Sequence, residues 1–204
     1  MQGDDRQRLA AVRGSGLMVG TAHPTFDRAA RTVARCTGAP VALVSIVGAA
    51  RQHFVGQWGL DGALAARRGT PISSSCCRFV ATADTPVVAD DVAKHPDLSP
   101  LPPIDGLTVG AYVGVPLRDG DGVPLGAVCA IDHTPRAWTV ADVTALEDVA
   151  SFLQAHLTLR STTRDLRDGA VAARTTTTPR RGARGRACDS LWVSRPGGGG
   201  SRRR

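Results

Sequence analysis

Three cysteines are the residues of this 204-residue chain best suited to chemistry. Cys76 and Cys77 are adjacent, at the predicted start of a short helix, and Cys129 follows later in an apolar segment. A thiolate near a helix N-terminus is stabilised by the helix dipole, so Cys76 or Cys77 is a candidate nucleophile that needs a second thiol in reach. The apolar neighbours of Cys129 instead favour the role of a small hydrophobic side chain.

Other groups that could do chemistry have spacings that argue against a site. The adjacent cysteines lack the spacing of zinc ligands, and no His-x-x-x-His pattern accompanies them. His53 and His95 are isolated histidines, which more often make an ordinary polar contact than bind haem. Asp90 and Asp91 follow a predicted strand, where acidic residues commonly cap the next turn. The glycine-rich phosphate loops of nucleotide-binding enzymes are absent.

The charge of the chain is unevenly distributed. The formal net charge is +7, but residues 164–204 hold eleven arginines against three aspartates, a balance of +8. The first 163 residues then carry fourteen basic and fifteen acidic groups, a balance of −1. The basic character therefore describes a tail, and with Trp192 as its only aromatic residue the sequence argues against nucleic-acid binding.

Composition also limits the cellular setting. The N-terminus is polar, and neither a signal peptide nor an apolar run long enough to span a membrane is present. Five cysteines without regular spacing favour reduced thiols. We therefore expect a cytoplasmic protein without a membrane contact.

Hydrophobic periodicity predicts an α+β domain. A helix is expected after Pro24, strands at 41–47 and 51–58, a loop over 59–74, a short helix over 75–83 and a short strand at 87–90. The proline-rich stretch 94–110 must be a loop, and loops of this length are usually functional. A hairpin follows at 111–118 and 125–132, and Thr139 caps a long final helix. We expect a flexible segment at 1–21, a domain at 22–162 and a basic, low-complexity, disordered tail at 163–204.

The order and the residues of these elements resemble the GAF domain. The agreement is carried by segments spread over residues 22–160: Val41–Val47 followed by Arg51 and Gln52, Pro71–Ser73 with Cys77, Val87, Val88 and Asp91, His95 and Pro96, Tyr112, Gly114–Arg118, Gly126, Cys129–Asp132, Pro135, Arg136 and Trp138. The resemblance implies a central antiparallel sheet of five to six strands flanked by helices, with the N- and C-terminal helices on one face. The chain is similar to the bacterial sensory type of GAF domain, which precedes a serine phosphatase, histidine kinase or diguanylate cyclase as the output domain.

The resemblance implies a non-catalytic sensor rather than an enzyme. A small molecule is expected in a cleft between the sheet and the short helix, and its presence is relayed through the final helix to a phosphatase or kinase partner. The residues expected to bind it are Phe54, Cys77, Phe79, Asp91, Tyr112 and Cys129. The identity of any cofactor is open. The sequence does not support haem, because His53 and His95 are isolated, and it does not support a bilin, because Cys77 is followed by Arg78 and not by histidine.

Two alternatives to the sensor remain. Some GAF proteins are free methionine sulfoxide reductases, but their cysteine in the loop before the second hairpin has no counterpart here, because residues 92–110 contain none. A scaffold or nucleic-acid-binding role would act through the basic tail. Nothing after the final helix is long enough for an output domain, so we expect a stand-alone sensor or a truncated or shifted reading frame.

The final helix carries more apolar residues than one packed face needs. A core stripe runs through Val143, Leu146, Leu153 and Leu157, while Phe152 and Leu159 form a second line. A helix that packs on one sheet requires one stripe. Phe152 and Leu159 therefore predict a homodimer through the terminal helices.

Overall fold

The computed structural model describes residues 2–18 and 23–176. The sheet, the helices packed on it and the features discussed below lie within residues 1–167, one compact unit of the chain; only the end of α5 extends beyond it. In chain order the elements are α1 (Gln2–Gly14), α2 (Pro24–Thr37), β1 (Val41–Val47), β2 (Arg51–Trp58), α3 (Gly62–Arg67), β3 (Gly69–Pro71), the 3₁₀ turn η1 (Ile72–Ser74), α4 (Cys77–Ala83), β4 (Val87–Ala89), η2 (Val92–Lys94), β5 (Ala111–Arg118), β6 (Pro124–Asp132) and α5 (Val140–Thr176).

Six strands form one antiparallel sheet in the order β3-β2-β1-β6-β5-β4. The two central strands, β1 and β6, pair so that Leu43 lies opposite Cys129. Every residue of β1 is buried, because side chains on both faces of this strand are covered. The α+β architecture predicted from the sequence is therefore confirmed.

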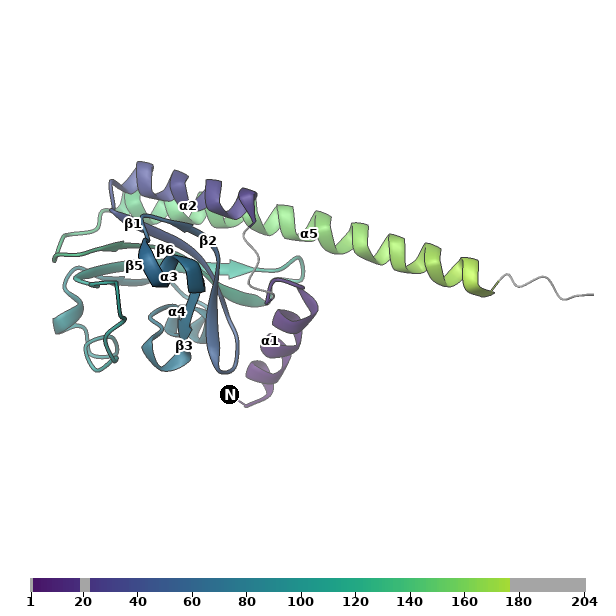
Figure 1. The fold of residues 1–204 in the computed structure, drawn as a ribbon, viewed down its shortest axis with the longest axis horizontal. Coiled ribbons are helices and arrows are strands. Elements are labelled where there is room, and N and C mark those ends of the chain that lie inside the picture. The colour runs from purple at the N-terminus through teal and green to yellow at the C-terminus, as the bar shows by residue number, and fades with distance from the viewer. Residues whose placement is uncertain (1, 19–22, 177–204) are drawn as a thin grey trace, which may run out of the picture. The chain divides into compact units, whose positions relative to one another are not determined.

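Helices α2 and α5 lie side by side on one face of the sheet (Figure 1). Proline at the first position of α2 and Gly38 in a left-handed conformation after it fix the ends of that helix. Phe26 of α2 packs edge-on against His156 of α5, and Leu146 and Leu153 of α5 are fully buried. This arrangement confirms that the N- and C-terminal helices of the domain share a face.

The opposite face of the sheet carries a second, separate apolar cluster. It is covered by α4, α3 and the loop over 92–110 rather than by long helices (Figure 1). Its buried members include Phe54, Leu64, Val80, Leu98 and Tyr112. Short helices and loops leave more irregular space than packed helices do, so this face is the one that can hold a ligand.

Residues 2–14 differ from the predicted flexible segment, because they form helix α1. The Arg8 guanidinium is buried and donates to the Val47 carbonyl oxygen at 2.6 Å, and Val12 and Leu17 join the core shared with α2 and α5. The helix therefore depends on tertiary contacts that its polar, glycine-interrupted sequence does not reveal. The predicted tail boundary at 163 also differs, because α5 continues to Thr176; the rest of the tail lies outside the described residues.

Residues 59–74 differ as well, because the predicted loop contains α3, β3 and η1. Strand β3 is only three residues long and pairs with β2, with Thr70 opposite Gln52. Such a short element has no periodicity of its own, and its conformation follows from hydrogen bonds to β2. Its importance is positional, since it leads directly into the start of α4.

Candidate functional site

Four of the six residues predicted to bind a ligand meet beneath α4. Phe54 comes from β2, Cys77 begins α4, Tyr112 lies on β5 and Cys129 on β6, and each side chain is at most 2% exposed. The sulfur atoms of Cys77 and Cys129 are 3.7 Å apart, and the Tyr112 hydroxyl donates to the Cys77 sulfur at 3.5 Å. These side chains fill the space between the sheet and α4, so they form a packed floor rather than an open pocket.

Gly114 makes room for this arrangement. It follows Tyr112 by two residues on β5, and alternate residues of a strand share a face. A Cβ atom at position 114 would overlap the Tyr112 hydroxyl. Glycine therefore lets the tyrosine ring lie along the strand and reach Cys77.

The buried thiols have strongly shifted acidities. Hydrogen bonds from Cys129 and Tyr112 favour the Cys77 thiolate and lower the pKa of Cys77. The same bond to Cys77, together with burial, raises the pKa of Cys129, and burial also raises the pKa of Tyr112. Of the three, only Cys77 is thus biased towards a thiolate, and at 2% exposure it is shielded from reactants.

The other two predicted residues lie apart from this floor. Phe79 packs at the edge of the cluster, half-buried, with the Arg78 guanidinium 4.6 Å from its ring centroid. Asp91 caps η2 by accepting from the Ala93 amide, and its carboxylate contacts Lys94 at 2.8 Å, which lowers the pKa of Asp91. The local capping role explains Asp91 without a ligand.

A polar network holds the start of α4 against the sheet. The side-chain oxygen of Gln52 accepts from the hydroxyls of Ser45 and Ser75, and its amide nitrogen donates to Thr70 at 2.7 Å. All four side chains are buried. The Ser75 hydroxyl also accepts from the Arg78 amide in the first turn of α4, which ties this network to the helix.

The open space lies beside the packed floor. A cavity of about 660 Å³ is bounded by the loop over 92–110, by the residues before α4 and by the end of β6. Its walls include Ser74, Cys76, Leu98, Leu107, Thr108 and His133, and none of the six predicted residues is among them. Its volume is typical of small-molecule sites. The four prolines of the loop were the sequence signal for its location.

The loop is fixed at its base and connected to the final helix. The Val92 amide donates to the Gly110 carbonyl oxygen and the Gly110 amide to that of Asp132, each at 2.8 Å. His133 contacts the Thr108 carbonyl oxygen through Nδ1 at 3.0 Å. The long segment therefore closes on itself as a compact loop whose ends lie against β6.

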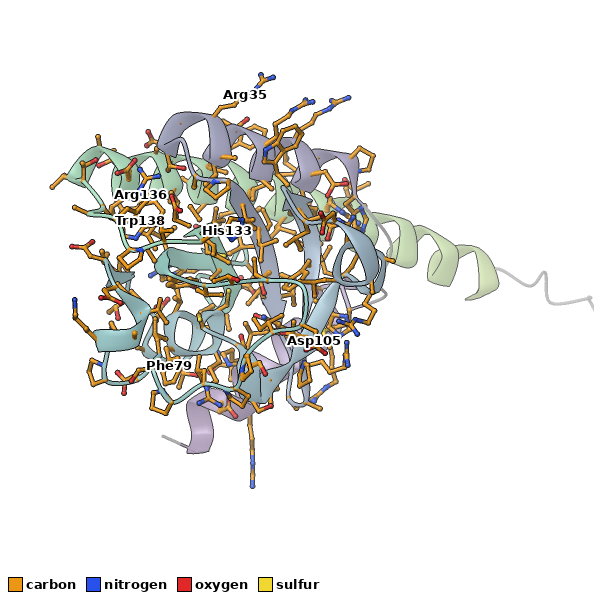
Figure 2. The ribbon with its side chains drawn as sticks, turned by 60° about the vertical axis from the view of Figure 1, so that its left-hand side comes forward. Arg35, Phe79, Asp105, His133, Arg136 and Trp138 are labelled. Carbon is orange, nitrogen blue, oxygen red and sulfur yellow. The ribbon has the colours of Figure 1, made fainter. Side chains whose placement is uncertain are left out.

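The residues between β6 and α5 bind the end of β4. The Asp90 carboxylate accepts from the Trp138 amide, and the Asp90 carbonyl oxygen accepts from the Arg136 amide, both at 2.9 Å. Arg136 and Trp138 stack closely (Figure 2), with 4.4 Å from guanidinium carbon to ring centroid. Thr139 caps α5 as predicted, and it forms a capping box with Asp142. One hydrogen-bonded segment thus joins the cavity loop to this helix.

Cys76 is the one cysteine on the cavity wall, and its environment opposes reactivity. Burial raises the pKa of Cys76 to about 12 from 9.0, which lowers the thiolate fraction at neutral pH about a thousandfold.

We therefore expect iodoacetamide at pH 7.5 to alkylate exposed Cys36 rapidly and Cys76 at least about a hundredfold more slowly. Peptide mapping over time measures both rates. Rapid alkylation of Cys76 in the folded protein would contradict this burial.

Within residues 2–18 and 23–176, no three histidine, cysteine or acidic side chains gather as a metal site would require. The helices of this described part also lack an apolar stretch long enough to cross a lipid bilayer. Both statements concern the described residues alone.

The family model of the GAF domain matches residues 21–157. The chain belongs to the GAF family. This match covers the sheet, the cavity loop and most of the packed part of α5, so the predicted family is confirmed.

Known proteins and solved structures are similar to this chain. A cyclic di-GMP phosphodiesterase of Pseudomonas aeruginosa is 32% identical over 162 residues, which are 78% of this chain and 27% of that protein. The chain thus spans about a quarter of that relative. A GAF domain of a Coxiella burnetii phosphoenolpyruvate-protein phosphotransferase is 13% identical with a TM-score of 0.58, over 78% of this chain and 96% of that one. The free methionine-R-sulfoxide reductase of Neisseria meningitidis is 17% identical with a TM-score of 0.53, over 76% of this chain and 88% of that one.

Proposed function

We propose that this GAF domain is a non-catalytic sensor that binds a small molecule in the loop cavity and relays its presence to α5. The observation that carries the proposal is the 660 Å³ cavity itself, which is walled by apolar side chains and a few polar groups. Leu98, Leu101 and Leu107 offer apolar contact, while Ser74 and Thr108 offer hydroxyls. This mixture is the usual lining of a ligand site.

The relay is proposed to run through the segment that begins α5. A ligand against the loop would press on Thr108 and His133, which are in contact. Six residues after His133, Thr139 caps α5, and the intervening backbone is hydrogen-bonded to Asp90. A displacement of the loop base therefore changes the hydrogen bonds that position the first turn of the helix.

Indole, a neutral planar probe that fits the cavity, tests both parts. Titration of indole into ¹⁵N-labelled protein is expected to change the NMR chemical shifts of the Ser74, Leu107 and Thr108 amides. Through the relay, it should also change those of the amides of Val140–Val143. Leu101→Trp fills the cavity and should weaken binding about tenfold or more, whereas Thr32→Trp on the exposed side of α2 should not.

The outcomes separate binding from relay. Shifts confined to the cavity would contradict the relay and leave the binding site standing. Absence of any saturable shift near the cavity, or equal affinity in the Leu101→Trp protein, would overturn the proposed site.

We also propose that the domain associates as a homodimer through α5. Phe152 is 63% exposed, and Leu159 and Leu166 are exposed at successive intervals of seven residues, the repeat of a coiled-coil seam.

The partner receiving the signal is proposed to be a phosphatase or kinase, by analogy with the outputs that follow related GAF domains. The relative from Pseudomonas aeruginosa carries the name of a phosphodiesterase, which widens the class of outputs to nucleotide signalling.

Sedimentation of the protein tests the dimer. At about 100 μM we expect a dimer for the native sequence and a shift towards monomer for Phe152→Ala, because the change removes apolar area from the seam. Val140→Ala is the matched control, since Val140 is 83% exposed but lies two residues out of the sevenfold series. A native monomer at this concentration, unchanged by Phe152→Ala, would exclude this interface as a stable contact.

A thiol reductase is the competing function, and the proximity of Cys77 to Cys129 is the observation in its favour. The burial of both sulfurs and the raised pKa of Cys76 weigh against it. A scaffold or nucleic-acid-binding role of the basic tail would depend mainly on arginines after Thr176, which lie outside the described part of the chain.

A further inference from the structure

A second hollow adjoins the loop cavity. It has a volume of about 260 Å³, and Ser74, Pro103 and Ile104 border both spaces. The two hollows are therefore neighbouring chambers beneath one loop. A ligand that fills the first chamber can extend a substituent into the second.

The second chamber is lined by charged groups, unlike the first. Arg51 begins β2 and Arg67 ends α3, and both line this space. Asp105 of the loop also lines it and is labelled in Figure 2. Burial and the nearby charge of Arg51 lower the pKa of His53 on the same strand. Two cations and one anion leave the chamber with a net positive charge.

Arg51 and Arg67 have no structural task of the kind that neighbouring Arg68 has. Arg68 donates to the carbonyl oxygens of Phe54 and Val55 and pairs with Asp27 at 2.7 Å. Among the ion pairs of residues 2–18 and 23–176, none engages Arg51 or Arg67. Two arginines that face a hollow without an internal partner are suited to an anion from outside.

We propose that the ligand of this GAF domain is an organic acid, with its apolar part in the loop cavity and its carboxylate or phosphate held by Arg51 and Arg67. The proposal rests on the proposed function and adds the ligand class. A guanidinium presents two parallel N–H donors to either acid, which gives direction as well as attraction. Because both arginines are exposed, solvent screens the attraction, and the gain in affinity is expected to be about tenfold.

Matched indole derivatives test the ligand class. Indole-3-carboxylate and 3-indolyl phosphate carry the acid, and indole-3-carboxamide is the neutral counterpart of the carboxylate. Each is titrated into ¹⁵N-labelled protein, with the amides of Ser74, Ile104 and Leu107 as reporters. We expect at least one acid to bind about tenfold more tightly than the carboxamide, with a preference that falls as salt is added. The better of the two acids distinguishes a carboxylate ligand from a phosphate ligand.

Charge variants assign the preference to this chamber. The double variant Arg51→Gln/Arg67→Gln should remove it. The control Arg28→Gln/Arg35→Gln, which neutralises two exposed arginines of α2, should keep it; Arg35 projects outward from that helix (Figure 2). Asp105→Asn should increase the affinity for the acids, because it removes the one negative charge of the chamber.

The outcomes also separate this inference from the function on which it rests. Equal binding of carboxamide and acids, or an acid preference that survives in Arg51→Gln/Arg67→Gln, would overturn the ligand class and leave the cavity site intact. If no indole compound, charged or neutral, shifts the reporter amides, both proposals fail together.

Discussion

Gly126→Ala is expected to lower the free energy of unfolding by about 3 kcal/mol or more, enough to unfold much of a marginally stable domain. Gly126 lies on β6 directly opposite Ile46 of β1, at the centre of the sheet. A Cβ atom there would overlap the carbonyl oxygen of Ser45, a backbone atom that cannot rotate away. The two central strands would have to separate, with loss of ladder hydrogen bonds on both sides.

Urea unfolding followed by circular dichroism measures the effect. Gly14→Ala at the end of α1 is the control, because an added Cβ meets no heavy atom within 4 Å there. That change should alter stability by less than about 1 kcal/mol and in the stabilising direction, since alanine favours helix. Similar stabilities for the two variants would show that β1 and β6 do not approach as closely as described.

Gln52→Ala is expected to cost about 3–5 kcal/mol, because it leaves three buried hydroxyls without their partner. Ser45, Thr70 and Ser75 come from β1, β3 and the residue before α4, so one side chain connects three parts of the domain. Loss of the network should also loosen α4. Hydrogen exchange is expected to become faster in Cys77–Ala83 before other helices respond.

Gln57→Ala provides a matched control on the same strand. Gln57 is half-buried and makes one side-chain hydrogen bond, from its amide nitrogen to the Ala65 carbonyl oxygen at 3.0 Å. Its removal should cost about 1 kcal/mol. Equal losses in the two variants would mean that the network beneath α4 adds nothing beyond a single hydrogen bond.

The sequence predicted the elements whose burial leaves a pattern. Strand β1 is covered on both faces and is apolar except for Ser45, and the hairpin of β5 and β6 is interrupted only at its turn. The capping box at Thr139 and the stripe through Leu146, Leu153 and Leu157 located the start and the packed face of α5. The hydrophobic effect thus leaves a continuous apolar run in a strand covered on both faces and a repeat of three to four residues in a helix covered on one, and a sequence shows both directly.

Other elements depend on contacts between distant residues, which a sequence does not show. Helix α1 is fixed by Arg8 bonding to Val47, thirty-nine residues away, and β3 exists because Gln52 lies opposite Thr70. The candidate site was predicted in part for the same reason. The sequence predicted a ligand cleft between the sheet and the short helix, but in the structure Tyr112 fills that space, and the cavity opens instead under the loop.

The two edges of the sheet have a consequence for aggregation. The edge strands β3 and β4 are three residues long, and β3 ends in Pro71, which has no amide hydrogen to donate. Sheets with long, unprotected edges recruit further strands from other molecules and can grow into fibres. Here each edge offers too little free backbone to template such growth, although the sheet interior is rich in valine, isoleucine and alanine. A concentrated solution of this protein should therefore resist amyloid-like assembly, and partners should approach its helices and loops rather than extend its sheet.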